Sequence, residues 1–422
     1  MKLILVSLLA LAAFLSLWML GATPAVPSPA SPIGGCPVFP ADNVWNARID
    51  NLPVHPNSAA YVASIGSSVG LHPDFGAGQW NGHTIGIPYT TTRSSQSTPV
   101  PSITFTYADE SDHGPYYIPA NAPIEAGDGH VLVVDTDTCT LYELYAAAPT
   151  GNGGWTAGSG AIFNLRSNAL RPAGWTSADA AGLSILPGLA RYDEVQAALA
   201  AGGLGYIPHA LRFTVQTTQR AYVWPARHYA SSNTNSNVPP MGVRFRLKTN
   251  YDITRFPPQS RVILRTLQLY GMIIADNGSN WYVSGAPDPG WNDDDLHTLG
   301  GVTGANFEAV DESSLMMDPN SGQVRTLTPS PSPTRGEGGA TLTPSPSPTR
   351  GEGGATPTPT CRWPGDFNGN GTIDSADVQA EASHWPRRAV SAGDAPYDID
   401  GNGVVDIADV MAVAANLGRA CR

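Results

Sequence analysis

Two stretches near the C-terminus carry the most concentrated metal-binding chemistry in the chain. Residues 366–377 read DFNGNGTIDSAD, and residues 398–409 read DIDGNGVVDIAD. In each stretch, oxygen-bearing side chains fall at positions 1, 3, 5, 9 and 12 of a loop, with glycine at position 6. This spacing lets carboxylates, amides and one main-chain carbonyl converge on a hard cation, and the glycine permits the sharp turn. The two stretches therefore predict two Ca²⁺ ions.

The predicted calcium ligands are the oxygen-bearing side chains and the main-chain carbonyl at loop position 7. In the first loop they are Asp366, Asn368, Asn370, Thr372 (carbonyl), Asp374 and Asp377. In the second loop they are Asp398, Asp400, Asn402, Val404 (carbonyl), Asp406 and Asp409. Position 12 is Asp in both loops, where the usual EF-hand has a bidentate Glu. No clear helical pattern precedes either loop, so each unit is predicted to be a loop followed by a helix.

A pair of loop–helix units with Asp at position 12 resembles a type I dockerin, and the resemblance covers residues 361–422. It implies a small all-α, EF-hand-like domain whose partner is a cohesin-bearing scaffold protein. Dockerins usually carry small hydroxyl residues at loop positions 10 and 11. Here these are Ser375 and Ala376 in the first loop, and Ile407 and Ala408 in the second. The departure leaves open one-sided docking, an unusual cohesin, or a different use of the domain.

The N-terminus and the composition indicate an exported protein. Residues 1–25 combine Lys2, an apolar run and the small residues GATPA, which is the layout of a secretory signal peptide. An uncleaved anchor is the alternative, since about 18 apolar residues can span a membrane. We expect a secreted protein with no membrane contact after cleavage of the signal peptide. Attachment to the cell surface is the alternative. The 35 acidic and 23 basic residues give a formal charge of −12, which argues against nucleic acid as a partner.

A repeated linker divides the chain into two folded parts. Residues 326–340 read TLTPSPSPTRGEGGA, and residues 341–355 repeat them letter for letter. Such Pro-, Ser-, Thr- and Gly-rich sequence cannot bury a core, so residues 319–360 are predicted to be a disordered linker. It separates a large domain, residues 36–318, from the C-terminal domain, residues 361–422.

The four cysteines are distributed evenly between the two folded parts. Cys36 and Cys139 lie in the large domain, and Cys361 and Cys421 bracket the C-terminal one. In an exported protein they are expected to pair as Cys36–Cys139 and Cys361–Cys421, because the other pairings would cross the linker. No C-x-x-C spacing is present, which disfavours a zinc site.

The large domain is predicted to be mainly β. The elements do not alternate regularly between strand and helix, which disfavours a parallel α/β fold. We expect an antiparallel, β-sandwich-like domain with short peripheral helices. The turn sequence Asp276-Asn277-Gly278 predicts a tight connection between two of its strands. Strand-like runs occupy residues 102–107, 130–135, 140–146, 161–165, 210–215, 221–224, 242–247, 272–275 and 281–284, and helical patterns occupy residues 58–65, 192–201, 259–269 and 293–299.

Four residues of the large domain are candidates for acid–base chemistry. Asp179 and Asp276 each lie in a predicted turn beside aromatic residues, and two carboxylates flanking a sugar bond are the signature of a glycoside hydrolase. We predict them as the acid and the base. His209 and His228 are alternative general bases. Each has a plainer alternative, as a turn former or a hydrogen-bonded structural residue.

Arginine and tryptophan side chains are candidates for substrate binding. If the strands at residues 210–215 and 242–247 are neighbours, Arg212, Arg244 and Arg246 would line one surface. The alternative is a solvated sheet face on which the cationic stems cover apolar surface. Sugar-stacking platforms are predicted at Trp175, Trp224 and Trp281.

The resemblance to dockerins implies a function, because such chains usually carry polysaccharide-degrading domains. We therefore expect a glycoside hydrolase acting on a polysaccharide. One alternative is a lyase on acidic glycans, in which the three arginines neutralise the uronate and a histidine takes the proton. Another is a non-catalytic carbohydrate-binding or cell-surface structural protein. The large domain itself resembles, in residues 40–56 and 71–75, only uncharacterised secreted bacterial domains, and this likeness supplies no mechanism.

The calcium loops give the first testable prediction. Chelating Ca²⁺ from an isolated fragment of residues 361–422 should reduce its helical circular dichroism signal, because clustered carboxylates repel each other without the cation. A matched fragment carrying D377N and D409N should respond weakly to added Ca²⁺. An unchanged signal after chelation of the native fragment would contradict the two calcium sites.

Overall fold

The computed structural model describes residues 30–80, 82–201 and 205–325. The predicted signal peptide, the calcium loops, the C-terminal disulfide and residues 326–360 of the linker lie outside these residues. The chain divides into two units, Met1–Pro331 and Ser332–Arg422, and every described residue belongs to the first. Among the described residues, no helix is long and apolar enough to cross a membrane.

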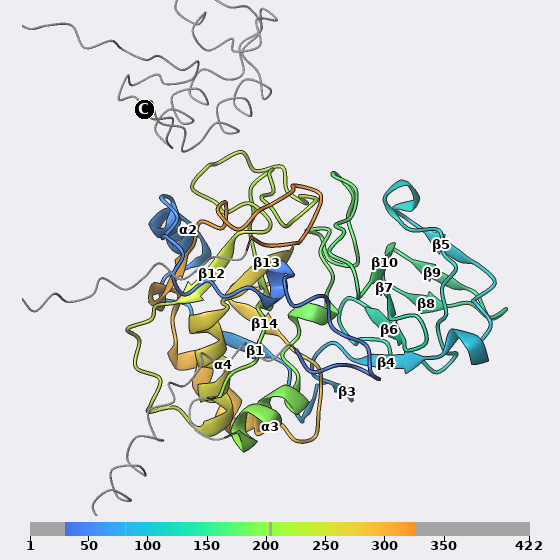
Figure 1. Ribbon diagram of the computed structural model, residues 1–422, viewed down its shortest axis with the longest axis horizontal. Helices are drawn as coiled ribbons and strands as arrows, with labels where there is room; N and C mark the ends of the chain where they lie inside the picture. Colours follow the sequence, from blue (N-terminus) through green and yellow to red (C-terminus); the bar gives the residue numbers. More distant parts are fainter. Residues whose placement is uncertain (1–29, 81, 202–204, 326–422) are drawn as a thin grey trace, which may run out of the picture. The chain divides into compact units, whose positions relative to one another are not determined.

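A six-stranded mixed sheet forms the centre of the large domain (Figure 1). The pairs β1–β14 and β11–β13 are parallel, and the other three pairs are antiparallel. β11 and β13 are nearly all buried, which agrees with their apolar sequences LRFTV and MIIADN. In spatial order the strands are β1 (His72–Asp74), β14 (Tyr282–Ser284), β11 (Leu211–Val215), β13 (Met272–Asn277), β12 (Arg244–Leu247) and β15 (Phe307–Ala309).

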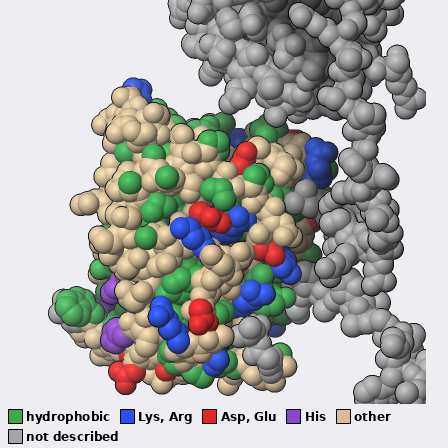
Figure 2. All heavy atoms as spheres, turned by 90° about the vertical axis from the view of Figure 1, so that its left-hand side faces the viewer, with side chains coloured by type: hydrophobic (Ala, Val, Ile, Leu, Met, Phe, Trp, Pro, Cys, Tyr) green, Lys and Arg blue, Asp and Glu red, His purple; other side chains and the backbone are tan. Residues whose placement is uncertain are grey.

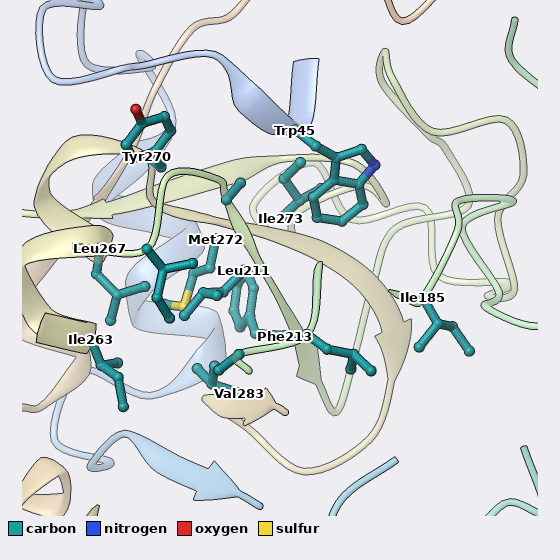
Figure 3. Packing of buried hydrophobic residues seen from close by; sticks show 14 of the residues in the cluster. Trp45, Ile185, Leu211, Phe213, Ile263, Leu267, Tyr270, Met272, Ile273 and Val283 are labelled. Carbon is teal, nitrogen blue, oxygen red and sulfur yellow. The ribbon is translucent and has the colours of Figure 1, made fainter. Parts of the chain in front are cut away.

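Helix α4 (Pro258–Leu269) packs against this sheet. Pro258 opens the helix at a position where its missing N–H costs nothing. Ile263 and Leu267 then point toward Leu211 and Met272 of the sheet (Figure 3). Most residues of α4 are buried, so the prediction of peripheral helices is wrong for this element.

A second sheet of four strands shares the same hydrophobic core. β7 pairs antiparallel with β6 and β10, and β4 pairs parallel with β6. A three-stranded sheet packs on it through a smaller core, and a two-stranded hairpin stands apart. The strands are β10 (Ser159–Asn164), β7 (Thr140–Tyr145), β6 (Val131–Asp135) and β4 (Tyr89–Thr92), then β5 (Ile103–Phe105), β9 (Trp155–Ala157) and β8 (Ala148–Pro149), and the hairpin β2 (Gln79–Trp80) and β3 (His83–Thr84).

The remaining helices are short. The prediction for residues 58–65 is confirmed, and those for residues 192–201 and 293–299 are confirmed within two residues. The α-helices are α2 (Ser58–Ile65), α3 (Tyr192–Ala200) and α5 (Asp293–His297). The 3₁₀ turns are η1 (Val44–Asn46), η2 (Ser94–Gln96), η3 (Ala108–Glu110), η4 (Leu186–Gly188), η5 (Thr298–Gly301) and η6 (Gly304–Asn306).

The mainly β prediction is confirmed, and seven of the eleven strand pairs among the described residues are antiparallel, but the sheets are mixed and not purely antiparallel. Parallel pairs occur in all three larger sheets. They could not be predicted, because the alternation of apolar residues along a strand carries no information about the direction of its partner. The expected connection at residues 276–278 does not form a hairpin, since β11 lies between β13 and β14. Residues 221–224 form a single bridge, from Tyr222 to Met241, and no strand.

The folded domain continues past the predicted boundary at residue 318. The indole of Trp224 donates to the carbonyl of Ser321 at 2.9 Å, and the main-chain N–H of Gly322 donates to the carbonyl of Asn168 at 2.6 Å. Arg227 donates to the carbonyl of Pro319 and to the Asn320 side chain. Residues 319–325 therefore belong to the domain and not to the linker.

The predicted disulfide of the large domain is confirmed. Cys36 and Cys139 are bonded, with their Cα atoms 5.3 Å apart, and close a loop with a sequence separation of 103 residues. Cys139 lies in the turn between β6 and β7, so the bond ties the N-terminal segment to the four-stranded sheet.

Replacing both cysteines by serine should lower the unfolding free energy of the large domain by about 2–5 kcal/mol, because the bond restricts a long loop in the unfolded chain. The measurement is thermal unfolding of the full chain. C361S/C421S is the matched control and should leave the transition of the large domain in place. Equal transitions in native protein and in C36S/C139S would contradict this role.

Candidate functional site

A buried ion pair marks the most polar part of the domain interior. Arg212, in β11, donates from Nε to Oδ2 of Asp179 at 2.9 Å and from its NH2 nitrogen to Oδ1 at 2.5 Å. The third guanidinium nitrogen donates to the Ser284 hydroxyl. Asp179 is 0% exposed and Arg212 is 4% exposed. Bidentate geometry satisfies both charges away from water.

The loop that carries Asp179 is held by both large sheets. The Asp179 main-chain N–H donates to the Ser177 hydroxyl at 2.9 Å. A few residues further on, the Glu143 carboxylate of β7 accepts from the main-chain N–H groups of Ile185 and Leu186, each at 3.0 Å. Burial raises the pKa of Glu143 to about 7, although these donors oppose the shift. The loop therefore bridges the six-stranded and four-stranded sheets.

Asp276 lies beside this pair, near the end of β13. A register shift between Phe213 and Thr214 of β11 places Thr214 opposite Asp276. The carboxylate accepts from the N–H of Asn277 at 2.7 Å and from the N–H of Ala180 at 3.3 Å. The sequence-predicted pair, Asp179 and Asp276, is thus brought together.

The surroundings of Asp276 suit proton transfer near neutral pH. Burial, followed by the negative charge of Asp179, raises the pKa of Asp276 to about 7, and the charges of Arg212 and His130 only partly oppose this. The residue is half-buried and lines a hollow that a ligand could enter. A carboxyl group with these properties can donate a proton at neutral pH.

A histidine–glutamate pair completes the charged cluster. Nδ1 of His130 lies 2.5 Å from Glu125 Oε2, and Nε2 lies 3.2 Å from the carbonyl of Ala178. Two acceptors require two N–H donors, which is the imidazolium form. Burial disfavours this charge, but the hydrogen bond and charge of Glu125 raise the pKa of His130 above its usual value.

Two adjoining hollows open over these residues. They have volumes of about 210 Å³ and about 360 Å³, and both are lined by Asp128, Asp276 and Asn277. The exposed Asp128 precedes β6 and so belongs to the four-stranded sheet, while Asp276 belongs to the six-stranded one. The cleft therefore lies where the two sheets meet. Tyr145 closes one side, and the carboxylates of Asp128 and Asp276 add to burial in raising its pKa.

His228 is the one sequence-predicted histidine that reaches this cleft. Its side chain is 23% exposed and lines the same hollow as Asp276. Nδ1 lies 2.8 Å from the carbonyl of Ala180, and Nε2 lies 3.7 Å from the carboxylate of Glu110.

His209 is a structural residue, so its prediction as a general base is wrong. It is 1% exposed, with Nε2 3.0 Å from Glu194 and Nδ1 2.8 Å from the carbonyl of Ala210. Glu194 also pairs with Arg191 at 2.8 Å. Both ring nitrogens are engaged, and His209 lines none of the described hollows.

The arginine surface predicted for substrate binding does not exist. β13 lies between β11 and β12, so the strands are not neighbours. Arg244 is 0% exposed and pairs with Glu312 at 2.9 Å, and Arg246 is 7% exposed and pairs with Glu308 at 2.8 Å. Both also donate to main-chain carbonyls of residues 44–52. Arg212 alone borders the cleft, and Asp179 neutralises it.

None of the three predicted tryptophan platforms lines the cleft. Trp281 is 0% exposed and stacks between Phe213 and Phe307, with ring centroids 5.7 Å and 5.2 Å away. Trp175 packs against the Arg171 guanidinium, 5.5 Å from its ring centroid. Trp224 is partly buried against the C-terminal segment.

Several cleft residues escaped the sequence analysis. Glu125, Asp128 and His130 occur in one short stretch, EAGDGH, directly before the buried strand β6. Acidic and histidine residues in a glycine-containing loop at a strand end are a recognisable signal for a site. Tyr145 and Glu110 lie far from this stretch in sequence and carry no such signal.

Charged side chains of both signs are mixed on one face of the large domain. On the face drawn in Figure 2, Lys and Arg side chains lie beside Asp and Glu side chains instead of gathering in one patch.

Comparison with known proteins identifies the C-terminal domain. Residues 364–418 match the family model for the dockerin type I domain, which confirms the resemblance seen in the sequence. Type I dockerins bind Ca²⁺ and dock onto cohesin-bearing scaffold proteins, so the match supports an extracellular, scaffold-anchored protein. No curated protein and no solved structure matches the chain.

The raised pKa of Asp276 predicts a pH-dependent cost to stability. The unfolded chain ionises this carboxyl group near its ordinary pKa of 3.8, whereas the folded domain holds its proton up to about pH 7. Between these values the folded state binds more protons, so stability falls as pH rises. The variant D276N cannot ionise and should gain about 1–4 kcal/mol relative to native protein between pH 4.5 and pH 8.

The matched control is D252N, at a carboxylate outside the cleft that Thr254 holds by two hydrogen bonds. Those hydrogen bonds lower the pKa of Asp252, so D252N should show no such gain as pH rises. Thermal unfolding of the three proteins across this pH range provides the measurement. Parallel curves for native protein and D276N would contradict the assignment.

Proposed function

We propose that the large domain is a glycoside hydrolase that uses Asp276 as its proton donor and that the dockerin anchors it to a scaffold. The observation that carries the proposal is a carboxyl group with a pKa of about 7, open to a cleft in which Asp128 supplies a second carboxylate. A raised acid beside another carboxylate is the arrangement that glycosidic cleavage needs.

In the proposed reaction, Asp276 donates its proton to the oxygen of the departing sugar as the bond to the anomeric carbon breaks. The carboxylate of Asp128 faces the developing positive charge at that carbon. One water molecule supplies the hydroxyl group of the new reducing end, and its remaining proton restores Asp276. No oxidant or reductant is required.

Asp179 takes a different role from the one expected of it. A carboxylate that is 0% exposed and bound at two oxygens by Arg212 cannot reach a substrate. Its charge instead disfavours ionisation of Asp276, which keeps the donor protonated. Asp179 is therefore a positioning residue, and Arg212 holds it in place.

The charge of the cleft favours a substrate without carboxylates. Asp128 and Glu110 line it together with Asp276, while Arg244 and Arg246 are paired elsewhere in the core. An acidic glycan would meet like charge here. This argues for a neutral or amino-bearing polysaccharide and against a uronate lyase. Tyr107 and Tyr145 supply aromatic faces suited to stacking on sugar rings.

The C-terminal domain has the anchoring role in this proposal. Ca²⁺ bound by the predicted loops at residues 366–377 and 398–409 would stabilise this domain. A cohesin then holds the chain outside the cell, and the linker lets the hydrolase move over its polysaccharide.

The test is to incubate the full chain with neutral and uronic polysaccharides and to measure new reducing ends and ultraviolet absorbance. We expect reducing ends without absorbance, from neutral substrates. D276N should lower kcat/KM by roughly 10²- to 10⁴-fold, and D252N should leave it unchanged. Native kcat/KM should also fall as pH rises through about 7, since Asp276 then loses its proton.

The other outcomes distinguish the alternatives. Absorbance from an unsaturated uronate would identify a lyase. Retention of native protein on a glycan without new reducing ends would identify a binding domain. Activity retained in D276N would remove Asp276 from the mechanism.

A further inference from the structure

The cleft around Asp276 continues into a third and larger hollow. This hollow has a volume of about 620 Å³ and shares Asp74, Glu125 and Tyr282 with the 210 Å³ hollow. The 210 Å³ hollow in turn shares Asp128, Asp276 and Asn277 with the 360 Å³ hollow. The three hollows therefore form one row, and Asp276 lies within it and not at an end.

We infer that this row is a single groove that binds a chain-like, uncharged glycan on both sides of Asp276 and cleaves it internally. The inference rests on the proposed hydrolase function and adds the substrate shape and the mode of attack. An enzyme that removes units from a chain end needs a binding site that is closed a short distance beyond the bond that is cleaved. Here space continues in both directions from the proton donor.

Each arm of the groove carries aromatic surface. In the larger arm, Trp80 of the β2–β3 hairpin is 73% exposed, and His72 stacks on Tyr282 with ring centroids 4.0 Å apart. In the other arm, Tyr107 is 50% exposed, and Tyr145 lines the same hollow. Exposed aromatic side chains at both ends suit a ligand that stacks successive rings along the groove.

Carboxyl groups line all three hollows of the groove, and the charge of His130 is paired with Glu125. The groove's only arginine, among the described residues that line the three hollows, is Arg212, which Asp179 neutralises. Carboxylates can accept hydrogen bonds from sugar hydroxyl groups but repel uronates. The acidic lining residues are Asp74, Glu110, Glu125, Asp128, Asp276 and Asp293.

The first measurement is binding, which does not depend on turnover. Full-length D276N is titrated with hexasaccharides of β-1,4-linked glucose, xylose and mannose, and with hexagalacturonate. At least one neutral hexasaccharide should bind, and hexagalacturonate should not. W80A and Y107A, each added to D276N, should weaken that binding by roughly 2- to 13-fold, the equivalent of one lost ring contact.

The second measurement is the cleavage pattern of end-labelled neutral hexasaccharide. The active chain should cut internal bonds first, and W80A and Y107A should move the preferred bond in opposite directions. M317A is the matched control, since Met317 is 55% exposed and lines none of the three hollows. It should change neither binding nor pattern.

The outcomes separate the two proposals. Single units released from one chain end, or identical patterns in W80A and Y107A, would overturn the groove while leaving a hydrolase. Binding without cleavage by the native chain would overturn internal attack and the hydrolase together. Failure to bind or cut any of the neutral hexasaccharides would also overturn both internal attack and the hydrolase. Tight binding of hexagalacturonate would overturn the inference that the substrate is uncharged.

Discussion

The ion pair between Arg212 and Asp179 is the interaction on which the rest of the site depends. It joins a strand of the central sheet to the loop that Glu143 holds to the four-stranded sheet. Removing one partner of such a buried pair costs about 3–5 kcal/mol, because the other charge is left unpaired. Asp179 of this pair adds to burial in raising the pKa of Asp276, and Arg212 partly opposes this shift. One contact therefore joins the two sheets and also influences the acidity of the group between them.

Buried arginines have a broader role in this domain, which has short strands and many irregular segments. Arg244 donates to the carbonyls of Val44, Ala47 and Tyr270 as well as to Glu312. Arg246 donates to the carbonyls of Ile49 and Leu52. Irregular backbone leaves buried carbonyls without ladder partners, and a guanidinium with several donors satisfies them together. The basic residues thus hold the N-terminal segment to the sheet and do not serve the substrate.

Local features of the fold could be predicted from the sequence, and its long-range pairing could not. The helix at Ser58–Ile65 and the strand at Leu211–Val215 follow from capping and from apolar periodicity, which act over a few residues. The placement of β11 between β13 and β14 depends on contacts between distant segments. For the site, Asp179 and Asp276 could be chosen by type and turn context. That Asp179 is sealed by Arg212 could not be predicted, because the two residues are 33 positions apart and no local pattern encodes their contact.

The C-terminal segment of the large domain determines where a pull on the linker would act. Gln323 bridges to Asn43 and also donates to the side chain of Asp42, so the two ends of the folded domain are tied together. If a scaffold holds the dockerin while the cleft grips an immobile polymer, tension enters the domain at residues 319–325. The first bonds to bear it join Arg325 to Leu315 and Val324 to Asp42. The bonds of Trp224 and Arg227, in the segment that leads to His228 at the cleft wall, would be loaded only after these. The tie between the two ends of the domain therefore shields the cleft from mechanical load on the anchor.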